Sequence, residues 1–237
     1  MVVVIGIFEV DLQSRWLAGT LACVGGIDRG AVVNRFAAGF DEADENLEDM
    51  LDSLSGADNY IAYINELCQP HFSGRILEIG AGNGDLTEVF GRTSPVVATD
   101  ISDRLLVQLR SRFDGDDNVI VRSYDALNDD SVTGEAPGSF GSAVMINVLE
   151  HLEDDVDAMR RIAEQLEPGG RLVVFVPAFE FLYSSFDRAI GHHRRYRRST
   201  LDAAFEAAGL RPTGSRYVNL PGWFAWLLLV RLANRPP

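Results

Sequence analysis

Short apolar runs alternate with helical patterns through the middle of this chain, and this alternation constrains the fold more than any other feature. The runs do not alternate polar and apolar residues, so each predicts a strand that is buried on both faces. The five runs are Arg75–Ile79, Pro95–Thr99, Asn118–Arg122, Ser142–Ile146 and Arg171–Val176. Helical patterns lie between them at Asp85–Gly91, Asp103–Phe113 and Asp154–Gln165. This order predicts an α/β fold that is Rossmann-like and doubly wound, with a mostly parallel sheet and helices on both faces.

The two ends of the chain differ from this core. Residues 1–56 are interpreted as an acidic, helical N-terminal extension, with a lid or a dimer contact as its candidate roles. Residues 57–237 are expected to form one domain, which opens with a helix that ends before Pro70. Residues 177–198 are interpreted as an insertion on the acceptor side of this domain. A further helix is expected at Thr200–Ala208 and a further strand at Arg211–Val218.

Composition excludes several classes of protein. The 237 residues carry a net charge of −14, which argues against a general nucleic-acid binder. All basic residues are Arg, so no lysine chemistry is available. Two cysteines far apart suggest a reducing compartment, and we expect a cytoplasmic protein. The apolar runs Met1–Val10 and Trp223–Val230 are too short to span a bilayer.

A glycine-rich loop follows the first of the five runs. Its sequence, from Glu78, is Glu-Ile-Gly-Ala-Gly-Asn-Gly, ending at Gly84. Glycines allow a tight turn and a close approach of a ligand to the backbone. The dinucleotide fingerprint would need glycine at position 85, where Asp85 stands instead. The loop is therefore a candidate ligand cradle, although such loops can also be simple strand–helix turns.

Two acidic residues follow the next two runs. Asp100 lies 20 positions after Gly80, where a carboxylate can accept both hydrogen bonds of a ribose diol. Its alternative role is to cap the helix that begins near Asp103. Asp125, followed by Ala126, is placed to accept from an exocyclic adenine amine.

Together these motifs resemble the core of the class I S-adenosylmethionine-dependent methyltransferases. The matching segments span residues 75–176 and read LEIGAGNG, TDIS, SYDAL, INVLEHLEDD and LEPGGRLVVFVP. The resemblance implies a seven-stranded sheet, S-adenosyl-L-methionine as cofactor and S-adenosyl-L-homocysteine as product. It implies these cofactor-binding residues: Glu78, Gly80, Ala81, Gly82, Gly84, Asp100, Ile101, Asp125, Ala126 and Asn147. The segment that follows, from Leu182 to Tyr196, also resembles a bacterial subgroup of these enzymes, which modifies sugars, lipids or natural products.

Catalysis is expected at the end of the fourth run. A hydroxyl acceptor must lose a proton, and a neutral histidine is the usual base near pH 7. We predict His151 as the general base, with Glu150 in support. The alternative is that both residues only begin the next helix.

The predicted insertion concentrates arginine and histidine in an acidic protein. Since it follows the fifth run, it is interpreted as an acceptor clamp, with a solvated basic loop as the alternative. The predicted substrate-binding residues are Tyr183, His192, His193, Arg194, Arg195 and Tyr196. We predict no metal site, because no acid pair stands near the two histidines in the sequence.

These observations predict O-methylation of a hydroxyl on a sugar or similar polar metabolite. The alternatives are N- or C-methylation of a quinone-like or lipid-linked acceptor, an NAD(P)-dependent dehydrogenase, and a non-catalytic cofactor-binding module. The partner is expected to be a small-molecule or saccharide acceptor, and an anionic one is compatible with the basic loop. The apolar tail at residues 221–232 is interpreted as a core or homodimer-contact helix, with a membrane-surface or lipid-acceptor role as the alternative. No nucleic acid and no stable membrane insertion are expected.

Overall fold

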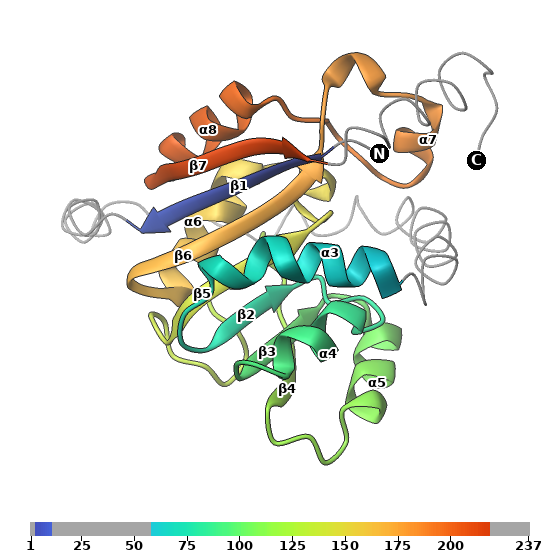
Figure 1. The fold of residues 1–237 in the computed structure, drawn as a ribbon, viewed down its shortest axis with the longest axis vertical. Coiled ribbons are helices and arrows are strands. Elements are labelled where there is room, and N and C mark those ends of the chain that lie inside the picture. The colour runs from blue at the N-terminus through green and yellow to red at the C-terminus, as the bar shows by residue number, and fades with distance from the viewer. Residues whose placement is uncertain (1–2, 11–57, 219–237) are drawn as a thin grey trace, which may run out of the picture.

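The computed structural model of the chain describes residues 3–10 and 58–218, which contain a seven-stranded sheet of order β4-β3-β2-β5-β6-β1-β7 (Figure 1). The strands are β1 (Val3–Val10), β2 (Ile76–Ile79), β3 (Val96–Asp100), β4 (Val119–Ser123), β5 (Phe140–Ile146), β6 (Leu166–Pro177) and β7 (Leu210–Val218). Strands β2 to β6 pair in parallel, and β1 is antiparallel to both of its neighbours. The Rossmann-like, mostly parallel fold expected from the sequence is therefore confirmed.

Helices cover both faces of the sheet. The helices are α3 (Asp58–Cys68), α4 (Asp85–Gly91), α5 (Asp103–Arg112), α6 (Asp155–Gln165), α7 (Ser185–Ala189) and α8 (Arg198–Ala207). Apolar residues of α3, α4 and α5 share one buried cluster, and those of α6 and α8 share another. These two clusters contain residues from opposite sides of the strands, such as Leu77 in one and Ile76 in the other. The doubly wound arrangement therefore follows from strands that are apolar on both faces.

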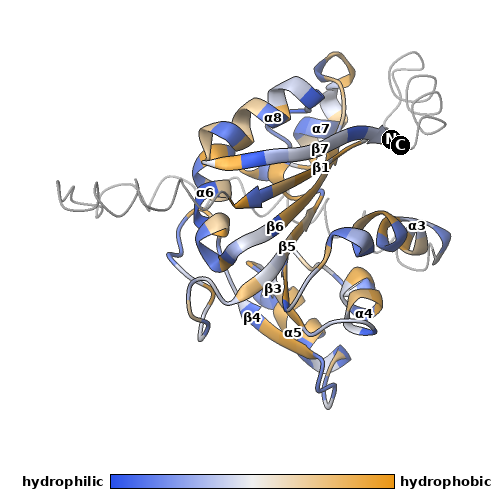
Figure 2. Ribbon diagram, turned by 60° about the vertical axis from the view of Figure 1, so that its left-hand side comes forward, coloured by the Kyte–Doolittle hydropathy of each residue, from blue (hydrophilic) through white to orange (hydrophobic). Residues whose placement is uncertain are grey.

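The sequence analysis did not anticipate β1. Val3–Val10, which it assigned to the N-terminal extension, is instead a strand between β6 and β7. In Figure 2 this strand is coloured apolar along much of its length. Three of its apolar side chains are fully buried: Val4, Ile5 and Phe8. The strand therefore completes the sheet between β6 and β7, which do not pair with each other. The rest of the predicted extension lies outside the described residues.

The Pro-Gly-Gly segment before the fifth run is part of a strand and not a loop between helix and strand. Residues 168–170 lie inside β6, where the pairing register with β5 shifts between Phe140 and Ser142. The expected helix boundary at Gln165 holds, but the chain enters the sheet through an irregularity instead of a separate turn. Gly170 has no room for a side chain there, because an added Cβ would lie 2.9 Å from the carbonyl oxygen of Glu167.

The other expected helices and strands of the domain are present, and most of their ends lie within one to three residues of the expected positions. The helix expected before Pro70 is α3, the one expected at Thr200–Ala208 is α8, and the last expected strand is β7. The apolar tail lies outside the described residues, so its interpretation stays a prediction. None of the described helices is long and apolar enough to cross a bilayer. The cytoplasmic location stays a prediction.

Replacement of Phe8 by alanine tests the place of β1 in the sheet. The Phe8 ring is fully buried and stacks on Phe205 of α8, with 3.2 Å between ring centroids. We expect Phe8→Ala to lower the free energy of unfolding by about 3–5 kcal/mol, measured by urea denaturation. Val107→Ala, on an exposed face of α5, is the control and should change stability by less than about 0.5 kcal/mol. Equal stability of the two variants would contradict the burial of β1.

Candidate active site

The glycine loop lies between β2 and α4, as the sequence predicts. Gly80, Gly82 and Gly84 all have positive φ angles, of 70°, 56° and 84°. An added Cβ on Gly80 would lie only 2.5 Å from Cγ2 of Val148, which belongs to the segment after β5. The backbone is therefore bare where the two segments meet, which suits the close approach of a ligand.

Asp100 holds this loop from the end of the neighbouring strand. Its Oδ2 accepts a hydrogen bond from the backbone N–H of Gly82 at 3.0 Å, and its Oδ1 accepts from Ser102 at 2.9 Å. The N-cap of α5 is Ser102, so the alternative capping role of Asp100 is wrong. Ile101 follows with 60% of its surface exposed, and its contact with a cofactor stays a prediction. The ribose contact of Asp100 stays a prediction, in a position that suits it.

Asp125 is engaged in its own turn. Its Oδ1 accepts from the backbone N–H of Leu127 at 2.9 Å and its Oδ2 accepts from the Asn128 amide at 2.7 Å. Ala126 beside it is buried. These bonds fix the carboxylate at the end of β4, and its contact with an adenine amine stays a prediction.

Glu78 is buried beneath the loop. Its Oε2 accepts a hydrogen bond of 2.6 Å from the hydroxyl of Thr87, on α4. Burial raises the pKa of Glu78 to about 8, and the nearby charge of Asp100 raises it further, while the bond from Thr87 opposes the shift. Glu78 therefore joins β2 to α4 below the glycines, and a contact with the methionine ammonium of a cofactor stays a prediction.

A basic residue that is distant in the sequence, Arg112, contacts the glycine loop. The guanidinium of Arg112, at the end of α5, donates to the carbonyl oxygen of Asn83 at 2.6 Å and to Asp85 at 2.7 Å. It also pairs with Glu88 at 2.8 Å. Two carboxylates therefore offset its charge, and the loop gains no net positive charge from it.

The segment after β5 begins with a strained residue. Asn147 has a φ angle of 54°, and its backbone N–H donates to the carbonyl oxygen of Phe175 at 2.8 Å. Its side chain forms a hydrogen bond with that of Tyr60, on α3. Its Oδ1 is buried without a hydrogen-bond partner among the described residues. Tyr60 was not expected at the site from the sequence, because its partner Asn147 lies far along the chain.

Glu150 and His151 follow on the 3₁₀ turn η2 (Leu149–His151). Glu150 is fully buried, and neither of its carboxylate oxygens has a hydrogen-bond partner among the described residues. Burial raises the pKa of Glu150 to about 8. Burial, with the nearby His192 and His193, lowers the pKa of His151 to about 3. His151 is therefore a neutral imidazole at pH 7, as the sequence analysis assumed.

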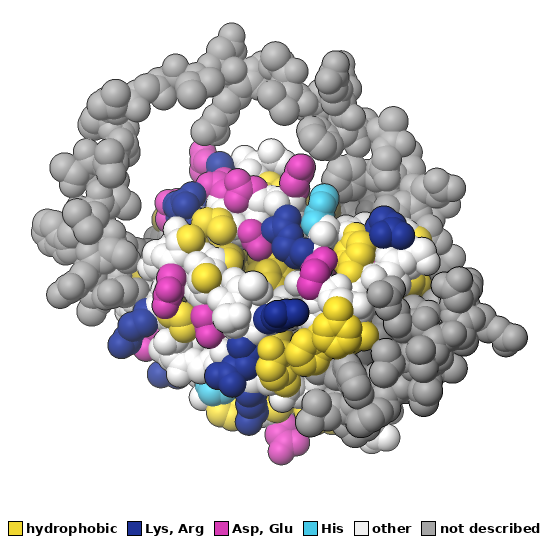
Figure 3. All heavy atoms as spheres, turned by 90° about the horizontal axis from the view of Figure 1, so that it is seen from above, with side chains coloured by type: hydrophobic (Ala, Val, Ile, Leu, Met, Phe, Trp, Pro, Cys, Tyr) yellow, Lys and Arg dark blue, Asp and Glu magenta, His cyan; other side chains and the backbone are white. Residues whose placement is uncertain are grey.

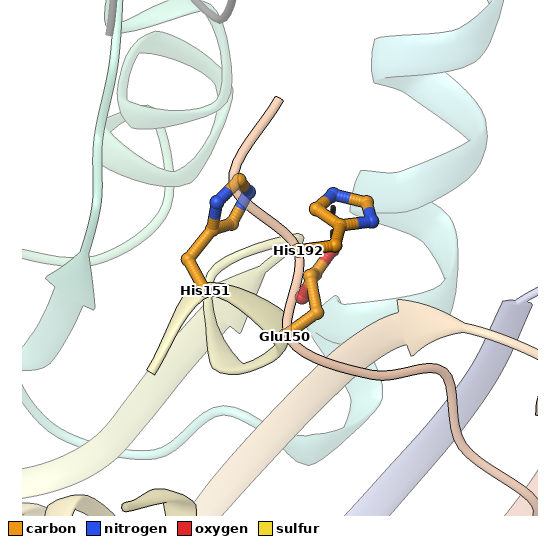
Figure 4. A group of neighbouring side chains, drawn as sticks. All are labelled: Glu150, His151 and His192. Atoms are coloured by element: carbon orange, nitrogen blue, oxygen red, sulfur yellow. Dashed lines mark ion pairs between the residues drawn. The ribbon is translucent and has the colours of Figure 1, made fainter. Parts of the chain in front are cut away.

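His192 crosses from the insertion to meet these two residues, as Figure 4 shows. Its Nε2 lies 3.8 Å from Oε1 of Glu150, and its ring meets that of His151 edge to face with centroids 4.6 Å apart. Its Nδ1 lies 3.1 Å from Oδ1 of the buried Asp187. The structure therefore brings the predicted catalytic pair and one predicted acceptor-binding residue into one cluster.

Asp187 is the anchor of the insertion, which the sequence analysis missed. It accepts from the backbone N–H and hydroxyl of Ser184 at 2.8 and 2.9 Å, and from Nε of Arg195 at 2.7 Å. Burial alone would raise the pKa of Asp187, but the bonds from His192, Arg195 and Ser184 lower it to about 2. The Ser-Ser-Phe-Asp run is a capping box at the start of α7, and its pattern is visible in the sequence.

The other predicted acceptor-binding residues mainly hold the insertion together. The Tyr183 hydroxyl donates to the carbonyl oxygen of His192 at 2.6 Å, and the buried Tyr196 donates to Asp155 at 2.8 Å. Arg194 pairs with the same Asp155 at 2.9 Å. A cavity of about 430 Å³ is lined by Arg194, Arg195 and Tyr196 among others. His193 is exposed, and acceptor contacts from all these residues stay predictions.

Charges of both signs lie around this face of the molecule. Figure 3 shows arginine side chains interspersed with acidic ones over the described residues. The described arginines of the insertion follow this pattern, since Arg194 and Arg195 each pair with a carboxylate. The charges of Arg194 and Arg195 are therefore offset within the protein.

The site has the features that a sulfonium cofactor needs. A bare glycine backbone, acidic side chains at the ends of two neighbouring strands and the buried Oδ1 of Asn147 lie at the carboxyl edge of the sheet. This edge is where open α/β sheets bind ligands. The fold and the loop thus define a cofactor-binding α/β domain with acceptors for a cationic ligand.

Comparison with known proteins agrees with this class. Residues 77–172 match the family model of a methyltransferase domain. A ubiquinone biosynthesis O-methyltransferase of Xanthomonas euvesicatoria is 26% identical over 178 residues, which cover 68% of this chain and 71% of the relative. Residues 77–172 thus match a methyltransferase domain, and the fold around them is the one that solved methyltransferases share. The protein is a methyltransferase enzyme whose cofactor is S-adenosyl-L-methionine.

Solved structures share the fold. The YcgJ protein of Bacillus subtilis superposes with a TM-score of 0.54 at 20% identity, over 64% of this chain and 68% of that one. Phosphoethanolamine N-methyltransferase 2 of Haemonchus contortus, solved with S-adenosyl-L-methionine, has a TM-score of 0.55 at 20% identity. That superposition covers 64% of this chain and 36% of the other.

Asp100→Ala tests the link between the strand end and the glycine loop. Removal of the carboxylate takes away two backbone hydrogen bonds to a charged acceptor. We expect the affinity for S-adenosyl-L-homocysteine to fall by about 1.5–3 kcal/mol, or roughly 10- to 150-fold. Calorimetry measures this change, with Asp103→Ala as control. Unchanged affinity in Asp100→Ala would remove Asp100 from the cofactor site.

Glu78→Gln tests the buried carboxyl group. Because the folded-state pKa of Glu78 is raised to about 8, the folded state holds a proton that the unfolded state releases above pH 4.5. The wild-type protein therefore loses stability as the pH rises from about 5 to 8. We expect Glu78→Gln to flatten this dependence, measured by denaturant unfolding at several pH values. An equally steep fall in the variant would show that other groups cause it.

Proposed function

We propose that this methyltransferase acts on oxygen, transferring a methyl group to a hydroxyl of a small-molecule acceptor. The observation that carries the proposal is the cluster of the buried Glu150 and His192 with the partly buried His151, beside the glycine loop. This cluster offers imidazole nitrogens that can accept a hydroxyl proton. The O-methyltransferase activity named for the Xanthomonas relative supports the same reaction.

The cluster lies where methyl transfer would occur. Bound S-adenosylmethionine supplies an electrophilic methyl group on its sulfonium. Val148, two residues before Glu150, packs over Gly80, so the cluster and the cofactor loop meet at one edge of the sheet. Alignment of the acceptor oxygen with the methyl group then supplies much of the acceleration. The general-base role of His151 stays a prediction, with Glu150 in support.

For the acceptor, we favour a ring hydroxyl of a quinone-like compound over a sugar. The arginines that suggested a saccharide or anion clamp pair with Asp155 and Asp187 within the protein. The curated relative takes part in ubiquinone biosynthesis. Phe181, in the insertion, is half exposed and offers an apolar contact to such a ring.

A panel of acceptors tests the proposal. We expect methyl transfer from labelled S-adenosylmethionine to phenolic hydroxyls, with the product identified as a methyl ether by mass spectrometry. Sugars should be poorer acceptors. Methylation of nitrogen or carbon, with no ether formed, would contradict the proposed reaction.

His192→Ala tests the cluster in the same assay. We expect kcat to fall by about 100-fold or more, because the variant loses a group that contacts the acceptor hydroxyl, while the affinity for S-adenosyl-L-homocysteine is unchanged. His71→Asn, which removes a histidine on the turn η1 (Gln69–His71), is the control and should keep its activity. Equal rates in the two variants would exclude the cluster from the reaction.

A further inference from the structure

Glu150, His151 and His192 each present one ligand atom to a common point. These three atoms lie within 4.8 Å of one another. Ligands about 2.1 Å from one ion stand about 3–4 Å apart, so small side-chain rotations would close the set. Figure 4 shows Glu150 and His151 on one turn and His192 on the segment that crosses it. Two elements distant in sequence therefore converge on a shared position.

Each histidine is already oriented by a hydrogen bond on one ring nitrogen. Nδ1 of His192 lies 3.1 Å from the Asp187 carboxylate, so its Nε2 is the nitrogen that faces Glu150. His151 is held by a hydrogen bond with the backbone of Gly191. In metal sites the ligating histidine donates its other ring N–H to a carboxylate or a backbone carbonyl, and this arrangement reproduces that pattern on both rings.

The carboxylate of Glu150 is the independent observation. It is fully buried, and neither oxygen has a hydrogen-bond partner among the described residues. A buried carboxylate without a partner is costly unless a cation or a proton satisfies it. Nε2 of His192 lies 3.8 Å from Oε1 of Glu150, too far for a hydrogen bond, and the Arg195 guanidinium acts on this carboxylate only through its charge. A cation between Glu150 and His192 would satisfy both groups.

We propose that Glu150, His151 and His192 bind one divalent transition-metal ion. Two imidazoles and one carboxylate favour ions such as Zn²⁺, Mn²⁺, Fe²⁺ or Co²⁺ over Mg²⁺ and Ca²⁺, which prefer oxygen ligands. Three protein ligands leave further positions open for water or an acceptor hydroxyl. The sequence analysis predicted no metal site beside His192 and His193. Glu150 stands far from this pair in the sequence, so only the fold shows that it lies near His192.

The ion would assist the proposed methyl transfer, and this part of the inference rests on that proposal. With the ion bound, His151 would act as a ligand and not as the base, so the acceptor hydroxyl would take an open position on the ion and lose its proton to solvent. Its oxygen then forms a bond with the methyl carbon, while the carbon–sulfur bond breaks and its electron pair stays on sulfur. The ion thus stabilises the oxygen anion that attacks.

Metal binding by untagged, full-length protein tests the inference without turnover. We expect the metal-free protein to bind one equivalent of Co²⁺, with a visible absorption band that Zn²⁺ abolishes. Glu150→Gln and His192→Asn should each weaken Co²⁺ binding at least tenfold, because each removes one of the three proposed ligands and even loss of an outer-shell partner typically costs 10- to 100-fold. His71→Asn removes a histidine elsewhere and should bind Co²⁺ as the wild type does.

Two results would overturn the inference. One is wild-type protein that binds no stoichiometric Co²⁺ or Zn²⁺, and the other is unchanged Co²⁺ affinity in both cluster variants. S-adenosyl-L-homocysteine binding, measured by calorimetry on each variant, confirms that it is folded. Should a variant fail to fold, the wild-type titration alone decides the outcome. Methyl transfer that persists without metal would retain the proposed function and remove only the role of the ion.

Discussion

The buried carboxylate of Asp187 is the interaction on which the acceptor side of the site depends. It accepts from Ser184 where α7 begins, from the Arg195 guanidinium and from the ring of His192. A buried carboxylate is stable only when such partners satisfy it, and removal of one partner of a buried ion pair typically costs several kcal/mol. This one group therefore fixes where the insertion crosses the turn after β5. The orientation of His192, and with it the proposed ion site, follows from that anchor.

The cofactor side depends on backbone instead of side chains. Three glycines with positive φ angles form the loop after β2, and Asp100 ties that loop to the end of β3. The missing Cβ of Gly80 lets Val148 approach the loop. The two sides of the site thus meet at adjacent parallel strands, β2 and β5, whose carboxyl ends lie at the same edge of the sheet. The reaction centre is a consequence of strand order, since only neighbouring strands place their following loops in contact.

Local signals in the sequence were enough for the core of the fold and for the cofactor loop. Apolar runs predicted β2 to β6, and glycine spacing predicted the turn at residues 80–84, because each depends on residues close together in the chain. Strand β1 was not predicted, because its partners β6 and β7 lie more than 150 residues away in the sequence. A short apolar run does not by itself show whether it is a strand or which strands it pairs with. The contacts of Arg112 with the loop and of Tyr60 with Asn147 were missed for the same reason. The sequence named Glu150, His151 and His192 separately, but only the fold shows that they share one point.

In this account the methyl donor and the acceptor meet at one edge of the sheet, between the glycine loop and the cluster of Glu150, His151 and His192. A crystal structure of the full chain with S-adenosyl-L-homocysteine bound measures this most directly. The account predicts that the sulfur atom faces the cluster, with space between them for a methyl group and an acceptor oxygen about 3 Å from its carbon. A sulfur atom directed away from the cluster, toward α4 or α5, would contradict it.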